Sequence, residues 1–360
     1  MKTTSNEQLD NIIRAIEPID NEYVNKSFQK WDSLCKPLRG LGWLEEAVAK
    51  MAGIYRTIEP QPNKRALLIM GADNGVVAEG VTQTDSSVTM QVLENIGDMK
   101  STACVMGRLA NCDVFPINIG ALTDGKNHRI HNCVVRYGTD NITKGPAMSR
   151  EECLKAIRVG VDSVSRVVKD GYNVILSGEM GIGNTTTSAA CAAVIMSLPA
   201  KVVTGRGAGL SDEGLMRKIT AIEKAIELNR PNLADPIDII SKVGGFDIAG
   251  MVGCFVGAAY NKVPIIIDGF ISQVAANLAD MLCSDIKGYM LPSHCSKEPG
   301  SMLLMERLEM SAPINANMHL GEGTGAVMAL SFIDQALNVY YNMATWEEGK
   351  VEAYIPQSQL

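Results

Sequence analysis

The fold is decided by the stretch Asn173-Val174-Ile175-Leu176-Ser177-Gly178-Glu179-Met180-Gly181-Ile182-Gly183-Asn184-Thr185-Thr186-Thr187. Its first five residues form a short, mostly apolar run that is typical of a buried strand. The glycines that follow permit a tight turn, and the segment after the turn is helix-like. A strand that passes through a glycine turn into a helix is the repeating unit of an α/β fold.

Four further apolar runs of strand length lie between helix-like segments, at residues 66–70, 114–119, 263–267 and 287–291. Continuous apolar strands that alternate with helices indicate a mostly parallel sheet with helices on both faces. Residues 1–55 read instead as helices. The stretch 324–346 is amphipathic, and its apolar face suits the core or an oligomer contact.

The residues that follow the predicted strands are polar and rich in glycine. In a parallel sheet these loops meet at the carboxyl edge, where open α/β folds bind their ligands. We therefore expect a site at this edge, although Asp, Asn and Gly also favour ordinary turns. The loops are Gly71-Ala72-Asp73-Asn74-Gly75, Gly120-Ala121, Gly178-Glu179, Asp268-Gly269-Phe270 and Pro292-Ser293-His294-Cys295-Ser296.

The glycine turn after residue 177 suits an anion. Amides of Gly181, Ile182 and Gly183 could cradle a phosphate at the start of a helix, together with Asn184 and the threonine hydroxyls. The alternative is an ordinary tight turn that Asn184 caps. Glu179 favours the functional interpretation, because a carboxylate beside an anion cradle suggests proton chemistry rather than anion binding.

A second glycine-rich segment, Gly321-Glu322-Gly323-Thr324-Gly325, also leads into a helix-like stretch. Glu322 could be an exposed first-turn acid that favours the helix dipole. In a cleft with little solvent its pKa would rise, which would suit a general base.

The composition restricts the classes of function. The net charge is −7 and no basic run is present, so nucleic-acid and anionic-membrane binding are not expected. No apolar run reaches the roughly 20 residues that span a bilayer, and the first residues lack the apolar core of a signal peptide. Nine cysteines without a C-x-x-C pair indicate reduced thiols in a cytoplasmic protein. Four histidines without convincing partners make a zinc site unlikely.

Taken together and in order, the segments resemble the nicotinate-nucleotide–dimethylbenzimidazole phosphoribosyltransferases of cobamide synthesis. The resemblance covers nearly the whole chain. It rests on the glycine-rich segments at 178–186 and 320–325, and on Leu34-Cys35-Lys36-Pro37, Leu41-Gly42-Trp43-Leu44-Glu45, Ala72-Asp73-Asn74-Gly75-Val76, Glu79-Gly80-Val81, Gly244-Gly245-Phe246-Asp247-Ile248, Asp268-Gly269-Phe270-Ile271, Ser293-His294 and Glu298-Pro299-Gly300.

The resemblance implies a six-stranded parallel α/β domain over residues 61–334. It implies a small helical domain formed by residues 1–60 with 335–360, and a dimer with active sites near the subunit interface. The implied reaction transfers phosphoribose from nicotinate mononucleotide to an aromatic acceptor and releases nicotinate. No pyrophosphate leaves, so neither a metal ion nor another cofactor is expected.

The resemblance also implies roles for single residues. Glu322 would be the general base and Glu179 a second acid beside it, while Gly181, Gly183 and Lys218 would hold the phosphate. The other residues expected to contact the substrates are Met180, Ile182, Asn184, Gly207, Asp268, Ser296, Leu320, Asp73 and Thr84.

Three segments depart from the family pattern. Asn74 stands where the family usually has histidine, Thr82-Gln83-Thr84-Asp85-Ser86 replaces a segment with a Tyr-Pro or Ser-Pro pair, and Lys36-Pro37-Leu38-Arg39-Gly40 replaces Lys-Pro-Pro-Gly-Ser. The second segment is expected to line the acceptor pocket, so the acceptor could be a benzimidazole, a purine or a phenol. The departures leave open a catalytically silent subunit of a heterodimer, or a nucleotide-binding protein without transferase activity.

Overall fold

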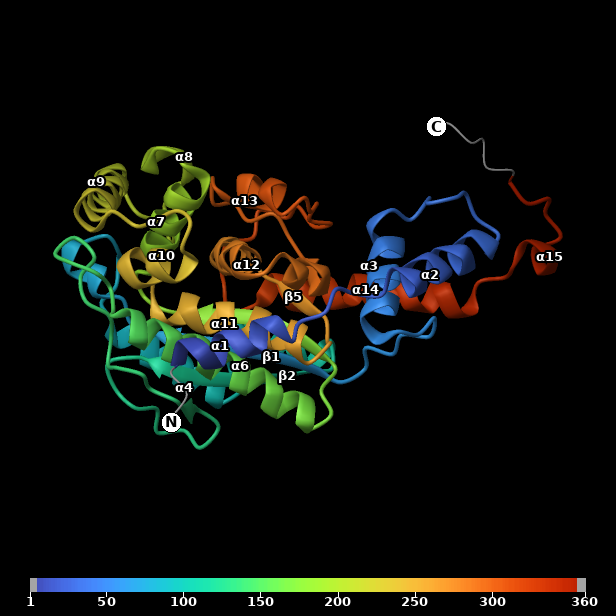
Figure 1. Cartoon of the computed structure of the whole chain (residues 1–360), viewed down its shortest axis with the longest axis horizontal. Coiled ribbons are helices and arrows are strands. Elements are labelled where there is room, and N and C mark those ends of the chain that lie inside the picture. The colour runs from blue at the N-terminus through green and yellow to red at the C-terminus, as the bar shows by residue number, and fades with distance from the viewer. Residues whose placement is uncertain (1–4, 355–360) are drawn as a thin grey trace.

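The computed structural model describes residues 5–354 and is built around one six-stranded parallel sheet (Figure 1). The strand order is β3-β2-β1-β4-β5-β6. The strands are β1 (Arg65–Ala72), β2 (Cys112–Gly120), β3 (His131–Asn132), β4 (Val174–Met180), β5 (Ile265–Ile267) and β6 (Met290–Pro292). The predicted α/β class with a parallel sheet is therefore confirmed.

Helices cover both faces of the sheet, which explains why β1 is buried at every position. Alternate side chains of β1 enter different cores: Leu68 and Met70 pack in one, and Leu67 and Ile69 in the other. The helices are α1 (Ser5–Arg14), α2 (Asn21–Ser33), α3 (Trp43–Tyr55), α4 (Ser87–Gly97), α5 (Thr102–Leu109), α6 (Arg150–Lys169), α7 (Asn184–Met196), α8 (Ala200–Val203), α9 (Asp212–Asn229), α10 (Pro236–Val243), α11 (Phe246–Tyr260), α12 (Phe270–Leu282), α13 (Ser301–Arg307), α14 (Thr324–Asn342) and α15 (Trp346–Gly349), with 3₁₀ turns η1 (Gly75–Glu79) and η2 (Ser284–Tyr289).

The two faces carry different sets of helices. α6 and α11 pack against each other on one face, with α7 and α12 beside them. α4, α5 and α14 cover the other face. Because α7 follows β4 directly and α12 follows β5, the first turns of both helices lie at the carboxyl edge of the sheet.

One strand prediction was displaced and one strand was missed. The run 287–291 is mostly the 3₁₀ turn η2, and β6 begins only at Met290. In this turn Tyr289 is buried and donates through its hydroxyl to the Glu17 carbonyl oxygen at 2.8 Å, so its apolar ring served a turn rather than a strand. The two-residue strand β3 carries no apolar pattern that would reveal it.

At one end of the molecule, α2 and α3 lie with the end of α14 and with α15, beyond the sheet (Figure 1). The rings of Trp31 and Tyr340 stack with centroids 4.9 Å apart, and Leu34 forms a β-bridge with Thr345. Helix α1 lies instead against α6 and α11. The division into a helical domain and an α/β domain stays a prediction, but the first helix contacts the α/β part.

Candidate active site

A cavity of about 390 Å³ opens at the carboxyl edge of the sheet. Its walls come from the loops after β4, β5 and β6, from the first turns of α7 and α12, and from segments 81–84 and 319–322. Eleven of the fourteen predicted site residues line it: Thr84, Glu179, Met180, Ile182, Gly183, Asn184, Gly207, Asp268, Ser296, Leu320 and Glu322.

Glu179 stands at the end of β4 and is 7% exposed. Its carboxylate accepts a short hydrogen bond from the side-chain amide of Asn184, in the first turn of α7. Burial raises the pKa of Glu179 to about 8, and the nearby Asp247, Asp268 and Glu322 carboxylates add to the rise. Glu179 therefore carries its proton at neutral pH.

Glu322 faces the same cavity from a loop whose backbone is left-handed at three successive residues. The φ angles are 91° at Gly321, 58° at Glu322 and 79° at Gly323. A side chain on Gly321 would reach within 2.5 Å of Glu179 Oε1, so glycine at 321 lets this loop approach the second acid. Of these three residues, only Glu322 carries a side chain in this unfavourable backbone conformation.

The environment of the Glu322 carboxyl group has opposing effects on its pKa. Burial raises its pKa, while the Ala103 amide and the Ser101 hydroxyl, at the start of α5, partly oppose that rise. Its Oε2 atom is buried and has no hydrogen-bond partner among the described residues. An acceptor atom left unpaired in a cavity is available to a substrate proton.

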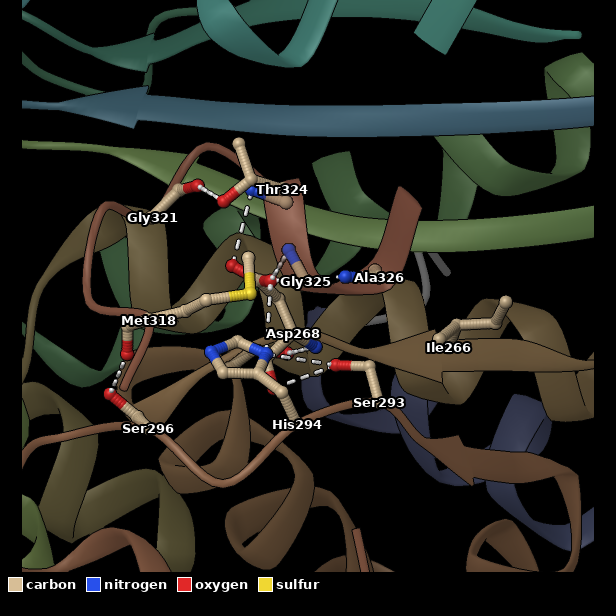
Figure 2. Close-up of polar contacts among 12 residues, drawn as sticks. Ile266, Asp268, Ser293, His294, Ser296, Met318, Gly321, Thr324, Gly325 and Ala326 are labelled. Carbon is tan, nitrogen blue, oxygen red and sulfur yellow. Dashed lines mark hydrogen bonds and ion pairs between the residues drawn. The ribbon is translucent and has the colours of Figure 1, made fainter. Parts of the chain in front are cut away.

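Asp268, after β5, anchors the Glu322 loop to the sheet (Figure 2). Its Oδ1 accepts from the amides of Gly325 (2.8 Å) and Ala326 (3.1 Å), and its Oδ2 accepts from Gly323 (3.2 Å). A carboxylate at a helix N-terminus is favoured by the helix dipole. Burial nevertheless raises the pKa of Asp268, against the effect of these amides and of His294, whose Nδ1 lies 3.8 Å away.

A buried lysine lies behind the part of the cavity wall that Thr185 and Gly207 form. Lys218, on α9, is fully buried, and its Nζ donates to Thr185 Oγ1 (2.8 Å) and to the Gly205 carbonyl oxygen (3.1 Å). Burial lowers the pKa of Lys218 to about 8. Lys218 does not line the cavity, but Thr185 and Gly207 beside it do.

The Glu298 carboxylate lies against this part of the cavity wall. The Gly207 amide donates to Glu298 Oε1 at 3.0 Å, while Glu298 Oε2 is buried and has no partner among the described residues. The amide that was predicted to contact a substrate thus already holds an anionic group. This makes the part of the cavity near Gly207 and Lys218 an anion-binding environment.

Two further predicted residues lie behind the wall of the cavity. Asp73 accepts from Thr89 Oγ1 (2.6 Å) and from the Leu122 amide (2.8 Å), and Thr89 in turn accepts from the Ile182 amide (3.1 Å). Gly181 packs so closely that a side chain there would reach within 2.6 Å of the Ala72 carbonyl oxygen. The Ile182 amide is therefore engaged by protein, and Asp73 supports the turn through Thr89.

Sequence reasoning assigned no role to several residues at or near the cavity. His294, Glu298 and Arg206 line it, and Asp247 lies directly behind it. His294 belongs to a loop that was expected at this edge, so its position was foreseeable. Asp247 carried no such signal, because it lies in the first turn of α11 rather than directly after a strand.

Two classes of feature are absent from residues 5–354. No group of three or more His, Cys, Asp or Glu side chains is placed to hold a metal ion. No helix in the same range is both long and apolar enough to cross a membrane.

The fold and the site define a class of enzyme: a parallel α/β protein whose cavity contains the Glu179 and Glu322 carboxyl groups and an anion-binding environment. Comparison with known proteins gives the family. A family model described as phosphoribosyltransferase matches residues 16–351. The chain belongs to the nicotinate-nucleotide–dimethylbenzimidazole phosphoribosyltransferase family.

Individual relatives cover almost the full chain. It is 45% identical over 345 residues to the nicotinate-nucleotide–dimethylbenzimidazole phosphoribosyltransferase of Acetivibrio thermocellus, covering 96% of this chain and 98% of that protein. The protein of that name from Clostridium acetobutylicum is 43% identical, over 97% of this chain and 99% of its own. The crystal structure of CobT from Thermus thermophilus matches with a TM-score of 0.87 at 31% identity, covering 92% of this chain and 100% of that one.

Proposed function

We propose that this protein transfers phosphoribose from nicotinate mononucleotide to an aromatic acceptor, giving the α-riboside phosphate and nicotinate for cobamide synthesis. The relatives named above carry this activity in their names. One observation carries the proposal for this chain: the unpaired Glu322 carboxylate oxygen shares a cavity with the anion-binding environment at Gly207.

In this proposal Glu322 is the general base. The acceptor loses a ring N–H or phenol O–H proton to Glu322 as its nitrogen or oxygen bonds to the anomeric carbon. The bond from that carbon to the nicotinate nitrogen breaks, and its electron pair returns to the ring, which leaves as a neutral pyridine. A carboxylate with a raised pKa is better matched to a proton transfer near neutral pH.

The phosphate would bind in the part of the cavity near Thr185, Gly207 and Lys218. The first turn of α7 presents its N-terminus there, and Thr185 and Lys218 supply a hydroxyl and a cation. Glu298 would have to leave the Gly207 amide for the phosphate to bind, because two anions cannot share one donor group. Fixing the phosphate positions the ribosyl carbon between this part of the cavity and Glu322.

The acceptor would lie against the apolar part of the wall, formed by Val81, Val92, Met180 and Leu320. Gln83 and Thr84 stand at the rim, and the Gln83 side chain donates to the Ala208 carbonyl oxygen, so segment 82–84 meets the loop near Gly207. These residues differ from the usual family pattern. We therefore keep benzimidazole, purine and phenol as candidate acceptors.

The decisive experiment measures nicotinate release from nicotinate mononucleotide with dimethylbenzimidazole, adenine, phenol or p-cresol. We expect turnover with at least one acceptor, and Glu322→Gln should lower kcat by about 10²–10⁴-fold with an unchanged circular dichroism spectrum. The matched control is Glu306→Gln on α13, outside the cavity. No release with any acceptor would refute the transferase, and a fully active Glu322→Gln variant would refute the base.

We further propose a cytoplasmic dimer. Val105 and Leu109 on α5 are 53% and 89% exposed, and the adjoining α14 exposes Met328, so these two helices offer apolar side chains to a second copy. Sedimentation equilibrium checks the mass, and a monomer at assay concentration would exclude the dimer. The presence of both Glu179 and Glu322 in one cavity favours an active subunit over a silent one.

A further inference from the structure

Asp247 is a fully buried carboxylate that the proposed reaction does not use. It lies in the first turn of α11, where its Oδ1 accepts from the Ile248 amide at 3.0 Å. Its Oδ2 is buried and has no hydrogen-bond partner among the described residues. An unpaired charged oxygen in the interior is costly, so its position next to the cavity calls for a function.

Asn184 connects Asp247 to the cavity. The Asn184 side-chain amide donates to Glu179, and its presence lowers the pKa of both Glu179 and Asp247. A side chain on Gly181 would come within 2.5 Å of Asp247 Oδ2 and 3.2 Å of Asn184 Nδ2, which places the two groups on one side of that glycine. One amide thus lies between two buried carboxyl groups.

The charges around this pair are all negative. Three carboxylates raise the pKa of Glu179. They are Asp247 on α11, Asp268 in the loop after β5 and Glu322 in the loop before α14. Asp247 faces Glu179 and also the Cys191 thiol on α7. Among the residues described, neither Glu179 nor Asp247 forms an ion pair with a lysine, arginine or histidine. Asn74, where the family usually has histidine, offers Asp247 only a neutral amide.

Two carboxylates that share a dry site cannot both be ionised without a cation, so the pair retains a proton. The proton belongs on Glu179, because the Ile248 amide donates to Asp247 and the nearby Asn184 and Asn74 side-chain amides lower the Asp247 pKa. Burial raises the pKa of Asp247 only to about 6, against about 8 for Glu179. Such separation of two neighbouring acids assigns different roles to them.

We propose that Asp247 is a positioning residue for the transfer reaction: its negative charge, on the far side of the Asn184 amide from Glu179, helps to hold Glu179 as a neutral carboxylic acid that presents a hydrogen-bond donor to the cavity. The general base Glu322 must be ionised to accept a proton. A neutral Glu179 places no second negative charge beside it, and its O–H group can donate a hydrogen bond to an anionic substrate group, such as the nicotinate carboxylate. This role rests on the proposed function.

The test is infrared difference spectroscopy of the protein between pH 5 and pH 10, which detects the carbonyl stretch of a protonated carboxylic acid without any turnover. We expect a band at pH 7 that is absent in Glu179→Gln. In Asp247→Asn the midpoint of this band should fall by at least about one pH unit, since a like charge has been removed. The variant Asp238→Asn, at a half-buried acid in the first turn of α10 and outside the cavity, is the matched control and should not move it.

The same variants are then assayed for pH dependence. With Asp247→Asn, the part of nicotinate mononucleotide binding that depends on the Glu179 proton should be lost at a pH about one unit lower than in the parent, while in Glu179→Gln only the dependence caused by Lys218 should remain. Asp247→Ser, whose hydroxyl can still accept from the Ile248 amide, serves if the asparagine variant does not fold. An absent band at pH 7, or an unmoved midpoint in both variants, overturns the inference. Neither result would bear on whether the protein is a transferase.

Discussion

Lys218 provides a sharp test of the anion-binding part of the cavity. We expect the KM for nicotinate mononucleotide to be constant below pH 8 and to rise above it. The reason is that burial lowers the pKa of Lys218 to about 8, so the free enzyme loses this cation over a range in which the substrate phosphate stays doubly charged.

The magnitude follows from the pKa. One unit above its pKa, about one Lys218 side chain in ten keeps its proton, so KM should rise about tenfold at pH 9. Lys218→Met should instead raise KM about 10- to 100-fold at pH 7, which corresponds to a lost charge-assisted hydrogen bond of about 1.5–3 kcal/mol. In this variant only the weakening that follows from loss of the Glu179 proton should remain above pH 8.

Lys218→Met should weaken substrate binding but raise the free energy of unfolding. A pKa lowered from 10.5 to about 8 means that the charged lysine destabilises the fold by roughly 3 kcal/mol below pH 8. Lys218→Met removes that penalty but also the bonds to Thr185 and Gly205, each worth about 1 kcal/mol. The net expectation is a variant about 1 kcal/mol more stable at pH 7, and the difference should shrink towards pH 10.

The assay is initial-rate nicotinate release between pH 6.5 and pH 9.5, with calorimetric unfolding of the same samples. Lys224→Met, on the exposed side of the same helix, is the matched control and should match the parent in both measurements. If the rise in KM above pH 8 persists undiminished in Lys218→Met, another group causes it and the reasoning fails.

Three further results are expected. The value of kcat/KM should fall as pH decreases through the raised pKa of Glu322, because only the ionised base accepts a proton; a pH profile without an acid limb above pH 4.5 would contradict this. Gly325→Ala should lower both activity and unfolding temperature, since the new methyl group would overlap the His294 ring and lie 2.8 Å from Asp268 Oδ1, whereas Gly145→Ala, with nothing within 4 Å, should affect neither. Trp31→Ala should lower the free energy of unfolding by about 3–5 kcal/mol, and the exposed Leu228→Ala should change it little; an effect of Trp31→Ala as small as that of Leu228→Ala in denaturant titrations would show that the packing of Trp31 does not stabilise the fold.

The sequence predicted the central strands because their signal is local. Residues 66–70 and 174–176 are continuous apolar runs, because both faces of these strands are buried. The run 287–291 misled because its apolar residues pack in a turn, and β3 is too short to leave a pattern. Local patterns cannot separate these cases, because only tertiary packing decides between them.

The site was predictable to the extent that strand order is. Glu179 lies at the end of β4 and Asp268 follows β5, so a shared sheet edge brings them together, and Glu322 lies just before α14, whose first amides donate to Asp268. Asp247 and Glu298 could not be assigned in the same way. Their importance arises from what lies opposite them, Asn184 in one case and the Gly207 amide in the other, in segments far apart along the chain.

The backbone at residue 322 has a consequence for how this protein would tolerate mutation. At φ 58° the position suits glycine better than any acid, so replacement by glycine should relieve strain of about 1–3 kcal/mol while it removes the proton acceptor. Selection for heat resistance alone would therefore favour inert proteins. A library screened only by melting temperature would enrich for inactive variants with glycine at position 322. Glutamate would be retained there only if the screen also selected for turnover.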